Sequence, residues 1–206
     1  MKVIVINGSP RPNGCTARAL TEVESVLHEN GIETIRINAG SKPVRGCVAC
    51  LYCRTHHRCV FNDDNVNETA QLLAEADGLI IGSPVYYAGM NGQLRAFLDR
   101  LFYSSSASDK TMKPGAVVLS SRRAGSTTAY DEAVKYFGIA SMPIVTSTYW
   151  NEVHGTTPQE VEQDLEGLQT MRNLGRNFAF LLKAIDSCRH LIPAQERGER
   201  TNFIKG

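Results

Sequence analysis

Short aliphatic runs alternate with amphipathic segments along most of the chain. The runs are rich in valine and isoleucine, have turn-forming residues nearby and are short enough to be strands. Five such runs predict five strands, at residues 3–6, 33–38, 79–81, 116–119 and 144–145. The first run is apolar throughout, which is typical of a strand buried on both faces of a parallel sheet.

Five other segments place apolar residues every three or four positions, the spacing of an amphipathic helix. They cover residues 15–30, 63–76, 94–101, 130–137 and 157–181. The last segment opens with Thr157-Pro158-Gln159-Glu160, which combines a capping box with proline in the first turn. Because strands and helices alternate, the pattern predicts an α/β fold with a doubly wound, five-stranded parallel sheet and helices on both faces.

One domain is expected over residues 1–186, followed by a polar C-terminal tail over residues 187–206. A length of 206 residues suits a single hydrophobic core. Residues 39–61 form a long polar stretch, and loops of this length are usually functional. This stretch is called the cysteine loop here, because four of the six cysteines lie in it.

The charge balance argues against two large classes of partner. Lysine and arginine number 22 and aspartate and glutamate number 21, which gives a formal net charge of +1. Such a chain offers no electrostatic basis for binding nucleic acid or a membrane surface. No apolar run reaches membrane-spanning length, and Met1-Lys2 leads directly into a strand rather than a signal peptide. We therefore expect a cytoplasmic protein without nucleic-acid or membrane partners.

The loop after the first strand has the features of an anion site. A Gly/Ser/Asn-rich segment, residues 8–14, joins a buried strand to a helix N-terminus, so that free N–H groups and the helix dipole converge. Ser9, Asn13 and Thr16 add side-chain donors, and Arg11 adds a positive charge. Neither a Walker motif nor a G-x-G-x-x-G fingerprint is present, which favours a phosphate monoester. An ordinary strand-to-helix turn is the alternative.

Two further loops follow strands in the same way. Residues 82–90 contain two tyrosines that offer flat faces and a glycine that lets backbone approach a ligand. Residues 120–127 are rich in small donors and contain two arginines. Because the carboxyl ends of parallel strands lie at one edge of a sheet, the three loops together predict a ligand with a phosphate, a polyol and a planar ring.

The cysteine loop contains a compact metal-binding pattern. Its cysteines, Cys47, Cys50, Cys53 and Cys59, have the spacing C-x2-C-x2-C-x5-C. A short loop with the first three spacings can bind three corners of a [4Fe-4S] cluster, and Cys59 could supply the fourth. A zinc ion suits this spacing less well, because structural zinc is usually bound by two separated C-x2-C pairs. Four thiols without a metal are the remaining alternative.

The sequence resembles the flavodoxin-like superfamily, and within it the branch of NADPH-dependent FMN reductases and iron-sulfur flavoproteins. The matching motifs are GSPRPNGCTA (8–17), GSPVYYAGMNGQLRAFLDR (82–100) and SSRRAGSTT (120–128). The resemblance covers about residues 1–185 and implies the strand order 2-1-3-4-5. The cysteine spacing also matches the compact motif of iron-sulfur flavoproteins.

The resemblance assigns each loop to one part of FMN. The residues implied around the phosphate are Ser9, Arg11, Asn13, Cys15, Thr16 and Ala17. Those implied along the isoalloxazine are Pro84, Val85, Tyr86, Tyr87, Ala88, Gly89 and Met90. Those implied beside the ribityl chain and pyrimidine edge are Ser121, Arg122, Arg123, Ala124 and Gly125. A cluster in the cysteine loop is expected beside the flavin.

The implied function is FMN-dependent oxidoreduction, with NAD(P)H as electron donor and a quinone, flavin or similar small molecule as acceptor. No catalytic side chain is assigned, because the flavin carries the chemistry. The alternative is a non-enzymatic iron-sulfur flavoprotein that carries electrons between redox partner proteins. Relatives in this branch cover the flavin with residues of a second subunit, so a homodimer or homotetramer is expected.

Overall fold

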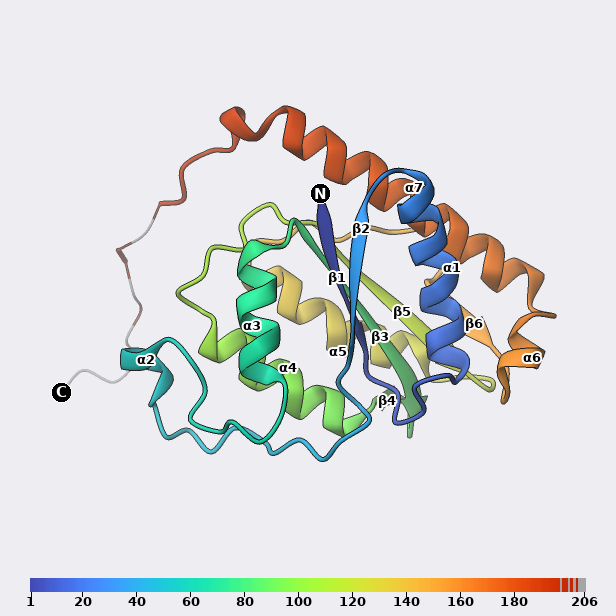
Figure 1. Ribbon diagram of the computed structural model, residues 1–206, viewed down its shortest axis with the longest axis horizontal. Helices are drawn as coiled ribbons and strands as arrows, with labels where there is room; N and C mark the ends of the chain where they lie inside the picture. The colour runs from blue at the N-terminus through green and yellow to red at the C-terminus, as the bar shows by residue number, and fades with distance from the viewer. Residues whose placement is uncertain (197, 200, 202, 204–206) are drawn as a thin grey trace.

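The computed structural model describes residues 1–196, 198–199, 201 and 203. Five parallel strands form the central sheet in the order β2-β1-β3-β5-β6. These strands are β1 (Lys2–Asn7), β2 (Glu33–Asn38), β3 (Gly78–Tyr86), β5 (Gly115–Ser121) and β6 (Glu152–His154). Counted among the parallel strands alone, this is the predicted order 2-1-3-4-5, and the doubly wound fold is confirmed (Figure 1).

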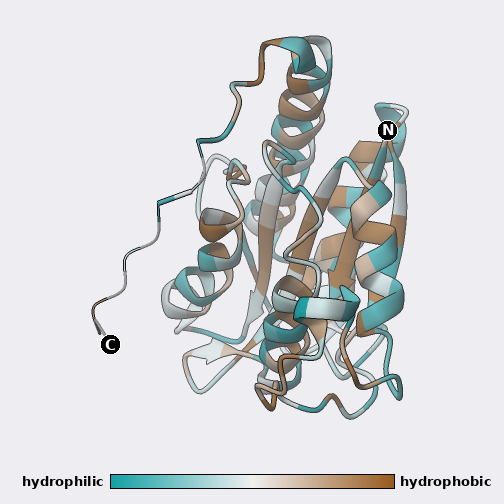
Figure 2. Ribbon diagram, turned by 90° about the vertical axis from the view of Figure 1, so that its left-hand side faces the viewer, coloured by the Kyte–Doolittle hydropathy of each residue, from teal (hydrophilic) through white to brown (hydrophobic). Residues whose placement is uncertain are grey.

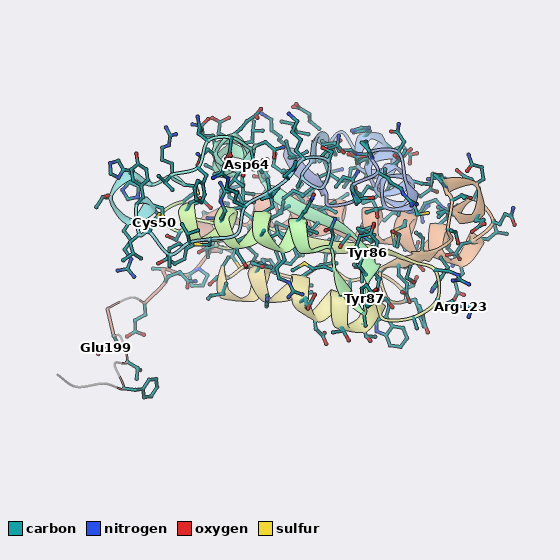
Figure 3. All side chains as sticks on the ribbon, turned by 90° about the horizontal axis from the view of Figure 1, so that it is seen from below. Cys50, Asp64, Tyr86, Tyr87, Arg123 and Glu199 are labelled. Carbon is teal, nitrogen blue, oxygen red and sulfur yellow. The ribbon has the colours of Figure 1, made fainter. Side chains whose placement is uncertain are left out.

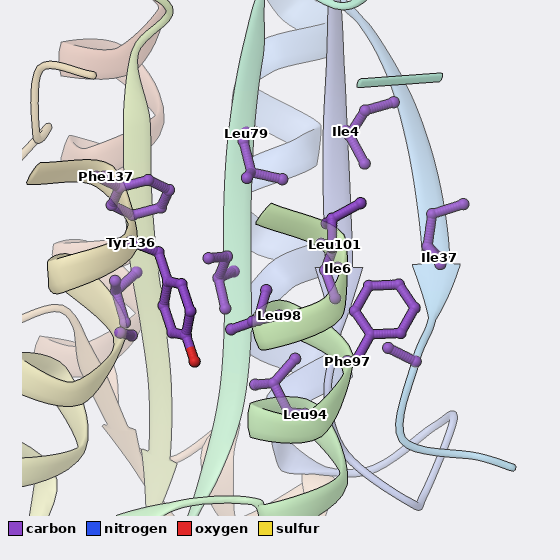
Figure 4. Packing of buried hydrophobic residues seen from close by; sticks show 14 of the residues in the cluster. Ile4, Ile6, Ile37, Leu79, Leu94, Phe97, Leu98, Leu101, Tyr136 and Phe137 are labelled. Atoms are coloured by element: carbon purple, nitrogen blue, oxygen red, sulfur yellow. The ribbon is translucent and has the colours of Figure 1, made fainter. Parts of the chain in front are cut away.

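Helices cover both faces of the sheet. On one face lie α1 (Cys15–Glu29) and α7 (Leu165–Ser187), and on the other lie α3 (Val66–Glu75), α4 (Gly92–Ser104) and α5 (Ser126–Ile139). Residues alternate along β1, so that Val3 faces the first pair while Ile4 faces the other three. Figure 2 shows apolar residues concentrated in the strands, and Figure 4 shows α4 side chains such as Phe97 and Leu98 packed against the sheet.

The edge strand differs from the prediction. Ile144 forms only an isolated bridge with Gly115, and the regular strand lies further along, at Glu152–His154. Between them, residues 146–151 leave the sheet and return to pair with the end of β5. The aliphatic pair at 144–145 thus marks the start of an interrupted strand, and the polar composition of β6 concealed its continuation.

Short elements also modify the predicted helices. The capping box at Thr157 begins the four-residue helix α6 (Pro158–Val161) rather than the long helix, which begins after a second cap, Asp164, whose side chain accepts a hydrogen bond from Gly167 N–H. Asn65 is the N-cap of α3, and Asp64 Oδ1 accepts from Val66 N–H at 3.2 Å. The cysteine loop contains one helical turn, α2 (Cys53–His56).

The chain continues past the domain as a short 3-10 helix, η1 (Arg189–Leu191), after α7 ends at Ser187. Arg189 binds back to the domain, 3.4 Å from Asp77 Oδ1. The predicted tail over 187–206 lies partly outside the described residues, and the division into domain and tail stays a prediction. In the described part of the chain, no helix has both the length and the hydropathy needed to cross a membrane.

Candidate functional site

Three loops lie at the carboxyl edge of the sheet, and we call them together the flavin edge, after the cofactor that the sequence resemblance implies. They are residues 8–14 after β1, the turn 87–88 after β3, and residues 122–125 after β5. The first loop is fixed against β3 and the start of α4, since Gly8 N–H donates to Gly82 O at 2.8 Å and the Asn91 side-chain Nδ2 donates to Gly8 O at 2.7 Å. Figure 3 shows Tyr86, Tyr87 and Arg123 at this end of the molecule.

The first loop presents an uncapped helix N-terminus. Asn7 Oδ1 accepts from Ser9 N–H and Ser9 Oγ accepts from Arg11 N–H, both at 3.1 Å, so the loop is held by its own side chains. Gly14 is the N-cap of α1 and provides no side-chain cap, and the first turn of α1 contains no acidic residue. The free N–H groups of that turn and the helix dipole therefore suit a phosphate.

The remaining residues of this loop have different surroundings. Arg11 and Asn13 are exposed at the rim. The hydroxyls of Thr16 and Ser120 are hydrogen-bonded to each other at 2.8 Å, which joins the first loop to β5. The Cys15 thiol donates to Gly155 O at 3.5 Å, and burial raises its pKa. Side-chain contact of Thr16 or Cys15 with a phosphate stays a prediction, while their first-turn N–H groups point to the same end of α1.

The second loop is a tight hairpin. Strand β4 (Gly89–Met90) pairs antiparallel with the end of β3, Tyr86 opposite Gly89. The two linking residues, Tyr87 and Ala88, both have positive φ, at 50° and 58°, as a type I′ turn requires. Neither is the usual Asn or Gly, so the turn needs support from outside. The predicted ring-side residues thus lie on one rigid hairpin.

Glu132 on α5 supplies that support. Its Oε2 accepts from Met90 N–H at 2.9 Å, and its carboxylate forms an ion pair with Arg95. Burial acts to raise the pKa of Glu132, but the Met90 hydrogen bond and Arg95 outweigh it and the pKa is lowered. The sequence reasoning missed Glu132, because 42 residues separate it from Met90 and no motif connects them.

The third loop brings polar groups to the ring-side hairpin. Gly125 caps α5 with φ at 97°, and a Cβ added there would lie 2.8 Å from Ala88 Cα. Arg122, Arg123 and Ala124 are exposed around it. Ser121 Oγ is buried and, within the described residues, has no hydrogen-bond partner. Buried hydroxyls are normally paired, so this orphaned group fits a polar ligand at the flavin edge.

The four cysteines of the cysteine loop line one small pocket. Cys47, Cys50, Cys53 and Cys59 share it with Arg100, Tyr103 and Ser104 of α4. All six cysteines of the chain are free thiols. Burial raises the pKa of Cys53, and the nearby Cys47, Cys50 and Cys59 raise it further.

The four thiols thus share one pocket, and the convergence of their sulfurs on a single cluster stays a prediction. Within the described ranges, no three His, Cys, Asp or Glu side chains close around a single ion position. One further feature fits an iron-sulfur cluster, whose sulfides accept hydrogen bonds. Ser104 lines the pocket, and its buried Oγ has no hydrogen-bond partner among the described residues.

Side chains from outside the loop fix Cys59. Asn67 Oδ1 accepts from Cys59 N–H at 2.8 Å, and Asn67 Nδ2 donates back to Cys59 O at 3.1 Å. Arg100 Nε donates to Cys59 Sγ at 3.2 Å, and its guanidinium pairs with Asp64. The sequence held a signal for Arg100, since it lies on the apolar face of its helix between Phe97 and Leu101.

Within one chain, the cysteine pocket and the flavin edge are separated. Asn91 caps the start of α4 beside the ring-side hairpin, whereas Arg100 and Ser104 lie near its end. At 1.5 Å per residue, that distance along the helix is about 14–20 Å. Figure 3 shows Cys50 at the opposite end of the view from Tyr86 and Tyr87. The cysteine loop begins against the flavin edge, where a Cβ added at Gly40 would lie 2.3 Å from Gly8 O. Its four cysteines lie near the other end of α4, so the expectation that a cluster held by them lies beside the flavin is wrong within one chain.

A doubly wound parallel sheet in this strand order, with an uncapped helix N-terminus after its first strand, is a flavodoxin-like fold. The family model of NADPH-dependent FMN reductases matches residues 1–157, and the chain belongs to this family. FMN is therefore its cofactor and NAD(P)H its electron donor.

A curated relative resembles this chain over most of its length, and solved structures share its fold. The chain is 36% identical over 192 residues to an iron-sulfur flavoprotein of Methanocaldococcus jannaschii, which covers 90% of this chain and 99% of that protein. Two solved structures share the fold at low identity. RosB with a bound formylriboflavin phosphate intermediate has a TM-score of 0.70 at 13% identity, covering 100% of this chain and 92% of that one. A WrbA-like flavodoxin from Agrobacterium tumefaciens has a TM-score of 0.61 at 17% identity, covering 89% and 98%.

Proposed function

We propose that this FMN-dependent NAD(P)H oxidoreductase passes electrons to a quinone, a free flavin or a similar small acceptor. The observation that carries the proposal is the exposed ring-side hairpin: Tyr86 is 46% exposed and Tyr87 is fully exposed at its tip. An open edge of this kind can admit a flat donor and a flat acceptor in turn. Bound FMN supplies hydride acceptance and electron release.

The residues of this chain hold and orient the cofactor. The first turn of α1 binds the phosphate through N–H groups, and the Glu132–Met90 contact fixes the hairpin against which the ring lies. Ser121 Oγ and the arginines of the third loop offer donors to the polar edge of the ring. Positive charge near that edge favours an anionic reduced flavin.

We also propose that the cysteine loop holds a [4Fe-4S] cluster, which would make the chain a carrier between redox partner proteins. Three observations support this second function: the shared pocket of four thiols, the orphaned Ser104 hydroxyl within it, and the iron-sulfur name of the relative from Methanocaldococcus jannaschii. The residues present fit a cluster, with Cys47, Cys50, Cys53 and Cys59 as ligands.

One preparation tests both proposals. Protein purified and reconstituted without oxygen is assayed for FMN, iron and acid-labile sulfide, and then for NADPH oxidation with and without an added quinone. The first function predicts turnover with quinone alone. Turnover that appears only when a redox protein is added supports the carrier instead. If the protein contains stoichiometric FMN but no iron, the reductase proposal stands and the cluster proposal is excluded.

We propose a homodimer or homotetramer, because an exposed ring-side hairpin is the kind of surface that a second subunit covers. Tyr149 and Trp150 form an edge-to-face pair in the segment that leaves the sheet before β6, and both are more than half exposed. Light scattering at micromolar concentration measures the mass, and a monomeric value would contradict this proposal.

A further inference from the structure

The side chain of Arg100 is the largest among those fully buried in the described chain, at 1% exposure. Its partner Asp64 is equally buried, with 2% of its side chain exposed. A buried arginine is stable only if its charge is paired and its N–H groups are bonded. The Asp64 carboxylate supplies the opposite charge, and its two oxygens accept hydrogen bonds from Nη1 and Nη2.

Two of the three remaining N–H donors of the guanidinium face the cysteine loop. Nη1 also donates to Arg45 O at 3.3 Å, and Nε donates to Cys59 Sγ at 3.2 Å. The ring of Phe61 lies under the guanidinium, 5.2 Å from Cζ to the ring centroid. Asp64 thus neutralises the Arg100 guanidinium and orients it so that Nε–H points at one of the four sulfurs. The planar guanidinium can bind the carboxylate and the sulfur at once, whereas the point charge of lysine cannot bind both with the same geometry.

Other charges of the same segment lack this geometry. Arg45 pairs with Asp63 in the open, with 63% and 52% of their side chains exposed. Solvent screens such a pair, so its effect on the pocket is small. Asp63 and Asp64 are adjacent and each pairs with an arginine, but the Asp63–Arg45 ion pair is exposed and the Asp64–Arg100 ion pair is buried.

We infer that Arg100, held by Asp64, is a positioning residue for a cluster in the cysteine loop: it fixes Cys59 as the fourth ligand and raises the cluster's reduction potential. The inference rests on the proposed cluster. Hydrogen bonds to ligand sulfurs and low solvent exposure are among the factors that set such potentials. An N–H donor to a sulfur stabilises the reduced cluster more, because reduction adds negative charge.

The test compares two double variants. Arg100→Gln with Asp64→Asn removes the buried pair without leaving an unpaired buried charge. Arg45→Gln with Asp63→Asn is the matched exposed control. Each protein, in full length and with FMN bound, is reconstituted without oxygen, and iron, sulfide and FMN are counted. The midpoint potential of the cluster is then measured by a titration followed by electron paramagnetic resonance.

The control is expected to match the wild type in iron content and potential. In the buried-pair variant, we expect partial loss of iron and, in the clusters that remain, a tenfold lower ratio of reduced to oxidised cluster at the wild-type midpoint. For a one-electron couple, this is a shift of about 59 mV to more negative potential. Arg100→Lys keeps the charge, so it should restore iron content while the potential remains lowered.

The outcomes separate the two claims. A wild type that binds FMN but no iron overturns the cluster and this inference with it. A loaded wild type whose buried-pair variant has unchanged iron and potential overturns the inference alone, as does an equal shift in the exposed control. If the double variant does not fold, as its FMN content and thermal unfolding would reveal, Arg100→Lys decides, and a wild-type potential in that variant overturns the inference.

Discussion

The flavin edge and the cysteine loop are built by different means. At the flavin edge, three strand ends fix three loops whose backbones approach closely, as Gly8 N–H does to Gly82 O, and side chains such as Asn91 and Glu132 support them. The cysteine loop has one helical turn, and side chains from outside, chiefly Asn67 and Arg100, hold it. Sheet topology organises the first region, and individual side chains organise the second.

This difference predicts how each region responds to change. Where loop backbones approach each other closely, as Gly125 does to Ala88, the site is sensitive to added volume and to φ. A site made of thiols and a buried ion pair is sensitive to the loss of single functional groups. The two sites should also fail independently, since the ring-side hairpin lies at the start of α4 and the cysteine pocket near its end.

The largest effect is expected for Cys50→Ser. A serine oxygen is a poor replacement for a thiolate ligand, so we expect loss of most iron and sulfide from anaerobically reconstituted protein. FMN affinity should stay within about twofold, because Cys50 lies in the cysteine pocket near the end of α4, whereas the ring-side hairpin lies at its start. Metal analysis and fluorescence quenching by FMN measure the two effects on one sample.

Cys188→Ser is the matched control, because Cys188 is an exposed free thiol outside the loop. It should keep both cofactors. Parallel loss of FMN and iron in Cys50→Ser would show that the two regions are coupled, and the contrast drawn here would then be wrong for the assembled protein.

A smaller effect is expected for Gly125→Ala. The added Cβ would lie 2.8 Å from Ala88 Cα at a φ of 97°, so the ring-side hairpin or the start of α5 must move. Strain of this kind costs about 1–3 kcal/mol, and FMN affinity should fall by roughly 5- to 150-fold. Iron content should not change.

Gly46→Ala supplies the control from the other region. A Cβ at Gly46 meets nothing within 4 Å, and its backbone is outside the left-handed region. We therefore expect wild-type FMN affinity and wild-type iron content. An equal loss in both glycine variants would mean that backbone space does not distinguish the regions.

The same contrast explains what the sequence could predict. Strand–helix alternation predicted the layers, and strand-end motifs predicted the three loops, because both depend on residues close together in the chain. The polar edge strand β6 and the two-residue β4 carry too little periodicity to be recognised. Arg100–Asp64 and Glu132–Met90 join residues 36 and 42 positions apart, so only the folded chain brings them together.

The smallest effect is expected for Glu132→Gln, which keeps the side chain's size but weakens the acceptor for Met90 N–H and removes the charge that pairs with Arg95. A hydrogen bond to a charged group is worth about 1.5–3 kcal/mol, and the amide oxygen retains part of it. We therefore expect FMN affinity to fall about 3- to 10-fold at pH 7, roughly 1 kcal/mol. Asp131→Asn, the exposed neighbour on α5, should have no effect.

The lowered pKa of Glu132 determines in which direction this effect changes with pH. Because the folded-state pKa of Glu132 is lowered, its contribution is complete above the ordinary carboxyl pKa and is lost as pH falls through the folded value. The FMN phosphate takes up a proton near pH 6, and this changes the FMN affinity of both proteins alike. The difference in FMN affinity between wild type and Glu132→Gln should therefore be constant from about pH 8 to pH 5 and shrink below about pH 4, where carboxylates protonate. A difference that persists unchanged to low pH would show that Glu132 acts through its shape alone.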